Sequence, residues 1–287
     1  MVKRAAIVAL TALLMMGCDV LDLKGLFVPT GDVVADRYEQ SMQMTGGEPL
    51  ATISADADYS VYLCTDSHIS DSYDNLREFV TQMRNDDEAP FGVVLGDCIG
   101  KRGVMSSYVE AIERVADSQP RNTPIFTVLG NHDIYFSGWD DFAAMVGPSV
   151  YWFEVCHNSG SDLFVTLDTA SGTLGGDQMR WLEELLATRR DNYRHCVVLT
   201  HVNLFNTDGS QRSSGNMTME ETHHLLDLFS RHRVTICFQG HDHHREDLAF
   251  GGVRYTIIGT IKDPAPAPEY LIVRLSDLGV EYSWQEM

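Results

Sequence analysis

Six short apolar runs, each followed directly by small or polar residues, constrain the fold of this chain more than any other sequence feature. They are rich in β-branched residues and occupy Val61–Cys64, Phe91–Leu95, Ile125–Leu129, Phe164–Leu167, Cys196–Thr200 and Thr235–Phe238. Continuous apolar runs of this length are typical of strands that are buried on both faces.

Segments with helical periodicity lie between several of these runs. Their apolar side chains share one helix face in three groups, Leu76/Phe79/Val80/Met83, Trp181/Leu182/Leu185/Leu186 and Leu225/Leu226/Leu228/Phe229. The pattern Thr218-x-x-Glu221 predicts a capped start for the third helix. The final forty residues differ, with strands predicted at Tyr255–Ile258, Tyr270–Val273 and Val280–Trp284 and no helix between them. Alternating strands and helices predict an α/β domain.

The amino terminus has the pattern of an export signal. Lys3 and Arg4 precede the apolar run Ala5–Met16, whose twelve residues are too few for a bilayer span of about 20. Leu14-Met15-Met16-Gly17-Cys18 resembles the lipobox of bacterial lipoproteins. We therefore expect residues 1–17 to be a signal peptide and Cys18 to be lipidated, with a plain secretory signal as the alternative. The lipid would anchor the chain in the bacterial cell envelope, facing the periplasm or the exterior.

Residues 18–57 show no sustained periodicity, and scattered Gly, Pro and Asp interrupt them. This composition predicts a tether between the lipid anchor and the folded body, in which short ordered pieces can occur. The folded domain is then expected over residues 58–287, where no composition shift marks a further domain boundary.

Polar residues with metal-binding side chains follow five of the predicted strands. They are Thr65-Asp66-Ser67-His68, Gly96-Asp97, Gly130-Asn131-His132-Asp133, His201 and Gly240-His241-Asp242-His243. Ligands of α/β sheets bind at the carboxyl ends of the strands, so these side chains are expected to meet. Oxygen and imidazole donors suit Mn, Zn or Fe and do not distinguish between them.

The ordered series D-x-H, G-D, G-N-H-D, H and G-H-x-H resembles that of the calcineurin-like metallophosphoesterases, over residues 59–287. The resemblance implies a four-layer α-β-β-α sandwich, in which two mixed sheets are flanked by helices and strand-end loops hold two metal ions. It assigns Asp66, His68 and His243 to the first metal, Asn131, His201 and His241 to the second, and Asp97 as the bridge between both. It also places His132 against the substrate, where it stabilises or protonates the leaving oxygen.

Two positions depart from that family pattern. Many relatives carry an acidic residue three positions after the bridging Asp, where it orients the catalytic His, and often a following Arg. Gly100 and Lys101 occupy these positions here. Asp133 or another carboxylate is therefore the candidate for orienting His132.

The resemblance implies an exported phosphoesterase that hydrolyses phosphate mono- or diesters with a hydroxide activated by two metal ions. Its expected partners are a small phosphate ester and, through the lipid anchor, a bilayer. Nucleic acid is not expected, because 41 acidic residues against 21 basic ones make the surface repel it. The alternative is a metal-bearing binding lipoprotein without catalysis. The presence of His132 favours the interpretation as an enzyme, since a binding protein without catalysis has little need for this residue.

Overall fold

The computed structural model describes residues 33–101, 103–118 and 123–287. The predicted signal peptide and Cys18 lie outside these residues. Within the described ranges, no helix is both long and apolar enough to cross a membrane.

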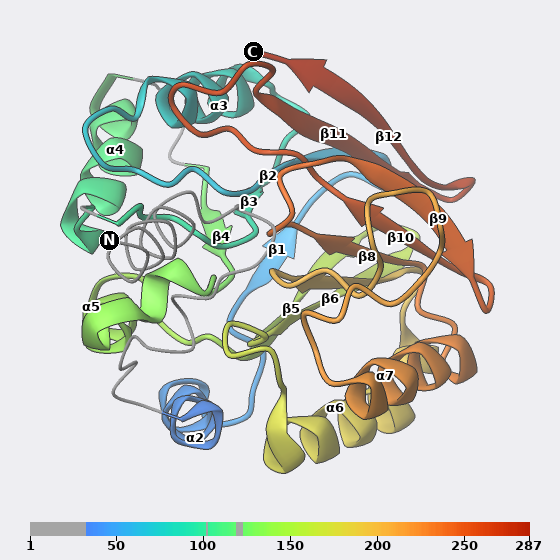
Figure 1. Cartoon of the computed structure of the whole chain (residues 1–287). Helices are drawn as coiled ribbons and strands as arrows, with labels where there is room; N and C mark the ends of the chain where they lie inside the picture. Colours follow the sequence, from blue (N-terminus) through green and yellow to red (C-terminus); the bar gives the residue numbers. More distant parts are fainter. Residues whose placement is uncertain (1–32, 102, 119–122) are drawn as a thin grey trace, which may run out of the picture.

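Two mixed β-sheets form the centre of the molecule (Figure 1). The seven-stranded sheet runs in the order β1 (Thr52–Ser54), β5 (Tyr151–His157), β6 (Gly160–Leu167), β7 (Cys196–Thr200), β8 (Ile236–Gln239), β10 (Val253–Ile257) and β9 (Glu246–Phe250). The five-stranded sheet runs in the order β12 (Gly279–Glu286), β11 (Glu269–Ser276), β2 (Tyr59–Cys64), β3 (Gly92–Val94) and β4 (Ile125–Thr127). Each sheet combines parallel and antiparallel pairs, as predicted.

Helices cover the outer face of each sheet. The five-stranded sheet is covered by α3 (Asp74–Asn85), α4 (Met105–Ser118) and α5 (Trp139–Met145), and the seven-stranded sheet by α6 (Gly175–Arg189) and α7 (Met219–Arg231), as Figure 1 shows. The 3-10 helix η1 (His132–Ser137) leads from the end of β4 towards α5. The side chain of Thr218 accepts a hydrogen bond from the Glu221 amide at the start of α7, which confirms the predicted cap.

Alternating side chains along the strands build separate cores on the two faces of each sheet. In β7, Cys196 and Val198 pack towards α6 and α7, whereas Val197 and Leu199 pack between the sheets. The same division occurs in β2, where Val61 and Leu63 face the other sheet and Cys64 faces the helices. Successive side chains of a strand point to opposite faces, so an unbroken apolar run fills two cores at once. The predicted four-layer arrangement is confirmed.

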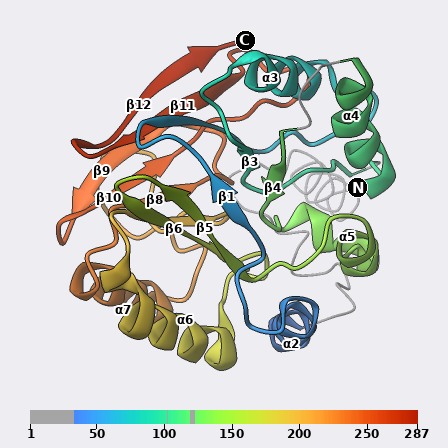
Figure 2. The same cartoon turned by 180° about the vertical axis from the view of Figure 1, so that it is seen from behind.

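The structure corrects the predicted tether. Within residues 18–57, the described part contains helix α2 (Val34–Thr45) and strand β1, which pairs in parallel with β5 (Figure 2). The inward face of α2 is polar: the fully buried guanidinium of Arg37 lies 2.7 Å from the Asp168 carboxylate, and the Ser41 hydroxyl accepts from the Ser149 amide. Hydrophobic periodicity cannot reveal a helix that is held by buried polar contacts, so the folded body extends further towards the amino terminus than predicted.

Other elements also differ from the predictions. Strands β5 and β9 and helices α4 and α5 were not predicted, and the strands predicted at Phe91–Leu95 and Ile125–Leu129 are shorter. The missing part of the latter, Val128 and Leu129, is buried but leads out of β4 into the loop that carries Asn131. Burial continues beyond the last residue of the strand, so apolarity alone overestimates the length of a strand.

Candidate metal centre

The strand-end loops bring all seven predicted metal ligands together at one edge of the two sheets. Three of these loops follow β2, β3 and β4 of the five-stranded sheet, and two follow β7 and β8 of the seven-stranded sheet. Three groups of three donors have their ligand atoms within 4.8 Å of one another. Two consist of predicted ligands, Asp66/His68/His243 and Asp97/His201/His241, and the third combines His68 and Asp97 with His132. Asn131 joins the second group through the contacts described below.

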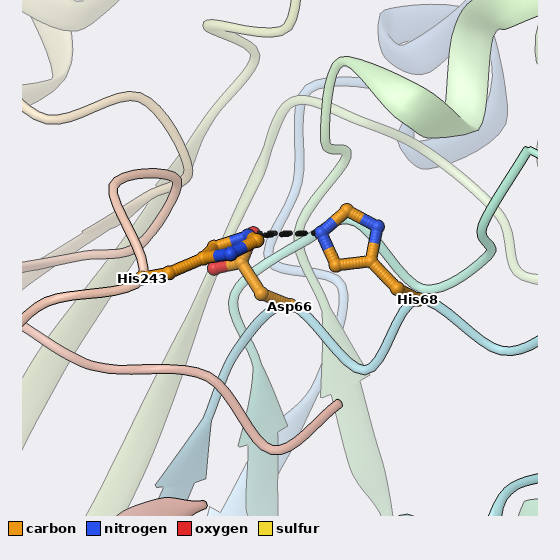
Figure 3. Close-up of side chains that lie close together, drawn as sticks. All are labelled: Asp66, His68 and His243. Carbon is orange, nitrogen blue, oxygen red and sulfur yellow. Dashed lines mark hydrogen bonds and ion pairs between the residues drawn. The ribbon is translucent and has the colours of Figure 1, made fainter. Parts of the chain in front are cut away.

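The first group lies between the loops after β2 and β8 (Figure 3). The Nε2 atoms of His68 and His243 are 3.0 Å apart. Oδ1 of Asp66 lies 3.2 Å from Nε2 of His243 and 3.5 Å from Nε2 of His68. Two imidazole nitrogens and one carboxylate oxygen thus face a common point, which is a donor set suited to Zn or to Mn and Fe.

The second group surrounds the side-chain oxygen of Asn131. This Oδ1 atom lies 3.0 Å from Nε2 of His201 and 2.9 Å from Nδ1 of His241, and the two nitrogens are 3.3 Å apart. Nδ1 of His201 lies 2.7 Å from the Leu95 carbonyl oxygen. That carbonyl can only accept, so the proton is on Nδ1 and the neutral ring would present the Nε2 lone pair to a cation.

Asp97 lies between the two groups and offers one oxygen to each. Its Oδ2 atom is 3.5 Å from Nε2 of His68, and its Oδ1 atom is 3.3 Å from Nε2 of His201. The amide of His132 donates to Oδ1 at 2.8 Å, which helps to hold the carboxylate in this orientation. A carboxylate placed in this way can bridge two cations about 3.5–4 Å apart.

Charge compensation dominates the electrostatics of this cluster. Burial alone would raise the pKa of Asp97, but the charges of His201 and His132 outweigh it and hold that pKa below its ordinary value. Burial would lower the pKa of His201, yet the charge of Asp97 raises it to about 10. The carboxylates are therefore anionic at neutral pH and need positive charge beside them. Protons on imidazole supply it in the metal-free protein, and cations would supply it in the loaded protein.

Backbone strain is concentrated at the same residues. Asp66, His68, Asp97, His241 and His243 all have φ between +41° and +76°, in the left-handed region. Asp and His enter this region more readily than most residues, but each such residue still costs on the order of 1–3 kcal/mol. The strain aims five side chains back over the ends of their strands, and the surrounding fold has to maintain it.

Close backbone approach explains two of the glycines. A Cβ on Gly130 would lie 2.0 Å from the Asp97 amide nitrogen and 2.2 Å from its Oδ1 atom, so the loop with Asn131 packs directly on the bridging residue. A Cβ on Gly100 would lie 2.3 Å from the Ser70 hydroxyl and 2.7 Å from the His68 carbonyl oxygen. The family's acidic side chain therefore has no room at position 100, which explains that departure.

His132 is placed beside the donors at the edge of the cluster. Its ring centroid is 4.6 Å from that of His68, its Nε2 atom is 3.9 Å from Oδ2 of Asp97, and its side chain is 18% exposed. The partial exposure leaves the ring open towards solvent, where a substrate would arrive.

The carboxylate of Asp133, the candidate for orienting His132, binds two backbone amides. Its carboxylate is fully buried and accepts hydrogen bonds from the amides of Gly130 (2.9 Å) and Ile99 (3.2 Å). Burial together with the charge of Asp97 raises its pKa to about 7. The side chain thus ties the loop after β3 to the loop after β4, and it is bonded to backbone amides in place of the imidazole of His132.

Sequence reasoning missed Tyr135, Thr65 and Thr260. The Tyr135 hydroxyl accepts from Nδ2 of Asn131 at 2.9 Å, and its ring centroid is 4.9 Å from that of His132. The hydroxyl of Thr65 donates to Oδ2 of Asp66 at 2.7 Å, and that of Thr260 donates to the Asp66 carbonyl. Thr65 directly precedes a predicted ligand, which is a weak signal. Nothing in the local sequence pattern around Thr260 indicates its role.

A four-layer sandwich with these donors at its strand ends defines the metallophosphoesterase class. The family model described as calcineurin-like phosphoesterase matches residues 59–245, and the chain belongs to this family.

Individual relatives are more distant. The chain is 28% identical over 171 residues to the serine/threonine-protein phosphatase CPPED1 of Pongo abelii and, equally, of Homo sapiens, which covers 53% of this chain and 53% of each relative. The chain thus spans about half the length of the curated relatives it matches.

Solved structures confirm the fold. GAP50, described as the anchor in the inner membrane complex of Plasmodium, matches with a TM-score of 0.61 at 14% identity, covering 80% of this chain and 85% of that chain. A dimetal phosphatase from Danio rerio matches with a TM-score of 0.54 at 13% identity, covering 78% of this chain and 98% of that chain.

Proposed function

We propose that this protein is a metal-dependent phosphoesterase that hydrolyses phosphate mono- or diesters with two metal ions. The observation that carries the proposal is the orientation of Asp97, which turns one oxygen towards each of two separate donor groups. The ions would be held by Asp66, His68 and His243 on one side, by Asn131, His201 and His241 on the other, and by Asp97 between them.

The donor set fits cations of the Mn, Zn or Fe type, because it combines imidazole with anionic and amide oxygens. When bound, such cations lower the pKa of a water towards about 7 and offset the negative charge of a phosphate. The protein's own contribution is placement: the strained loops hold the donors in position, and the hydroxyl of Thr65 and the amide of His241 both bind Oδ2 of Asp66, which leaves Oδ1 facing the cluster.

We assign to His132 the role of donating a proton to the leaving group. Its Nε2 atom lies 3.9 Å from Oδ2 of Asp97, and its side chain is 18% exposed. A proton held on Nε2 can pass to the departing alkoxide, which typically accelerates such a step by about 10²–10⁴-fold.

The relatives support phosphate esters as the substrate class. CPPED1 is described as a serine/threonine-protein phosphatase, and the Danio rerio protein as a dimetal phosphatase. A serine/threonine-protein phosphatase hydrolyses a phosphate monoester, so we expect the monoester to be the better substrate of the two classes.

The test is hydrolysis of matched chromogenic mono- and diesters by the purified protein, loaded with Mn²⁺ or Zn²⁺ and compared with a chelator-treated sample. We expect turnover that depends on the metal and is faster for the monoester. A protein that binds two metal ions but turns over neither ester would instead support a non-catalytic binding protein, a role compatible with a fold that GAP50 shares.

We also propose that the protein is exported and anchored by a lipid on Cys18 at the cell envelope. The support is the sequence alone, namely the charged start, the short apolar run and the lipobox-like segment. Expression in a bacterium with a radiolabelled fatty acid tests this. Label on the wild-type protein that is lost in Cys18→Ala is the expected result, whereas an unlabelled wild type released in soluble form would refute the anchor.

A further inference from the structure

The loop that follows β4 contains a residue with no role in the sequence-derived site. Helix η1 is interrupted within its own span, because Tyr135 has ψ 145° and Phe136 has φ 56° and ψ 38°. The interruption separates the side chain of Tyr135 from the regular turn, and its hydroxyl lies 2.9 Å from Nδ2 of Asn131.

The carboxamide of Asn131 has two unequal ends. Only Oδ1 can bind a cation, and it lies 3.0 Å from Nε2 of His201 and 2.9 Å from Nδ1 of His241. The Nδ2 end faces the other way, and Asn131 is only 8% exposed. A buried amide N–H without an acceptor is costly, so the orientation that directs Oδ1 towards the histidines depends on an acceptor behind Nδ2.

We propose that Tyr135 is a positioning residue for the second metal ion, acting through the side chain of Asn131. Its hydroxyl accepts from Nδ2 and so holds the plane of the carboxamide with Oδ1 towards His201 and His241. The proposal rests on the metal binding invoked in the proposed function, but not on catalysis. Partners behind a metal ligand typically contribute 10–100-fold to metal affinity.

The variant that tests this is Tyr135→Phe, which removes the hydroxyl and keeps the ring that lies 4.9 Å from His132. Tyr193→Phe is the matched control, because it also removes a half-buried hydroxyl with a 2.9 Å bond, to Glu154 on β5. The apoprotein is titrated with Mn²⁺ by calorimetry, and the loaded protein is examined by electron paramagnetic resonance for a spin-coupled pair.

We expect Tyr135→Phe to weaken one of the two binding events by about 10–100-fold and to leave the other unchanged. The spin-coupled signal should give way to that of a mononuclear ion at limiting Mn²⁺. Tyr193→Phe should match the wild type in every measurement.

A double-mutant cycle with Asn131→Ala separates positioning from packing. If Tyr135 acts through Asn131, adding Tyr135→Phe to Asn131→Ala should not change metal affinity further. An equal loss in both backgrounds, an unchanged titration of Tyr135→Phe, or a wild type that binds a single ion would each overturn the proposal. A wild type that binds two ions without hydrolysing any ester would refute the proposed function, and the titrations would still test Tyr135.

Discussion

The ion pair that attaches helix α2 to the rest of the molecule leads to a quantitative prediction. Arg37 and Asp168 are both fully buried, with Nε of Arg37 at 2.7 Å from Oδ2 and its Nη2 at 3.0 Å from Oδ1, while Nη2 also donates to the Ser171 hydroxyl. Arg37→Ala would leave the Asp168 carboxylate buried beside two remaining donors, the Ser149 hydroxyl and the Ala170 amide.

Removing one partner of a buried pair costs about 3–5 kcal/mol, because the charge left behind has lost its compensation. Total stabilities are about 5–15 kcal/mol, so the loss is a large fraction of the free energy of unfolding. At roughly 2–4 °C per kcal/mol, Tm should fall by about 6–20 °C. The measurement is thermal and urea unfolding followed by tryptophan fluorescence.

Arg180→Ala is the control for this experiment, since Arg180 pairs with Asp177 on α6 but both side chains are more than half exposed. Exposed pairs contribute about 0–1 kcal/mol, so this variant should unfold close to the wild type. If Arg37→Ala also lost less than about 1 kcal/mol, α2 would not be part of the cooperatively folded body, and the correction to the predicted tether would be wrong.

Three further predictions concern the metal centre. His132→Ala should lower turnover by about 10²-fold or more and leave the metal content measured by atomic absorption intact; loss of metal would show that His132 is a ligand. Gly130→Ala should abolish binding of at least one metal ion in a calorimetric titration, because its Cβ would lie 2.0 Å from the Asp97 amide; wild-type binding would mean that the loops adapt. Metal affinity should rise about tenfold per pH unit between pH 6 and 8. The pKa of His201 is raised to about 10, so a proton must leave its ring before a cation can bind there. An affinity independent of pH would show that His201 does not carry this proton in the metal-free protein.

The predictions from sequence succeeded where the information was local. The strand Cys196–Thr200 has the predicted bounds, and the Thr218 cap has the predicted hydrogen bond. In both cases residues a few positions apart specify the outcome, through side-chain alternation in one and a capping hydroxyl in the other. Helix α2 was not predicted, because its residue Arg37 is held by Asp168, which lies 131 positions away in the sequence.

The candidate metal centre likewise has features that local sequence predicts and features that it does not. The donors and their order along the chain were predictable, since each follows a recognisable strand. The function of Asp133 was not, because its partners are two backbone amides on separate loops. Tyr135 was invisible for a related reason, since only the interrupted helix η1 brings its hydroxyl to Asn131.

The sequence pattern by itself determined the α/β class and the candidate donors at the strand ends, because strands, caps and donors are encoded by neighbouring residues. The resemblance of the ordered motifs to a known family implied the four layers and the assignment of the donors to two metal ions. Tertiary structure alone decided how those side chains face one another. His68 and His243 are 175 positions apart and meet at 3.0 Å because two sheets pack face to face and strained left-handed turns aim the rings inward. A local pattern carries no information on such distances, because they arise from the packing of the whole chain.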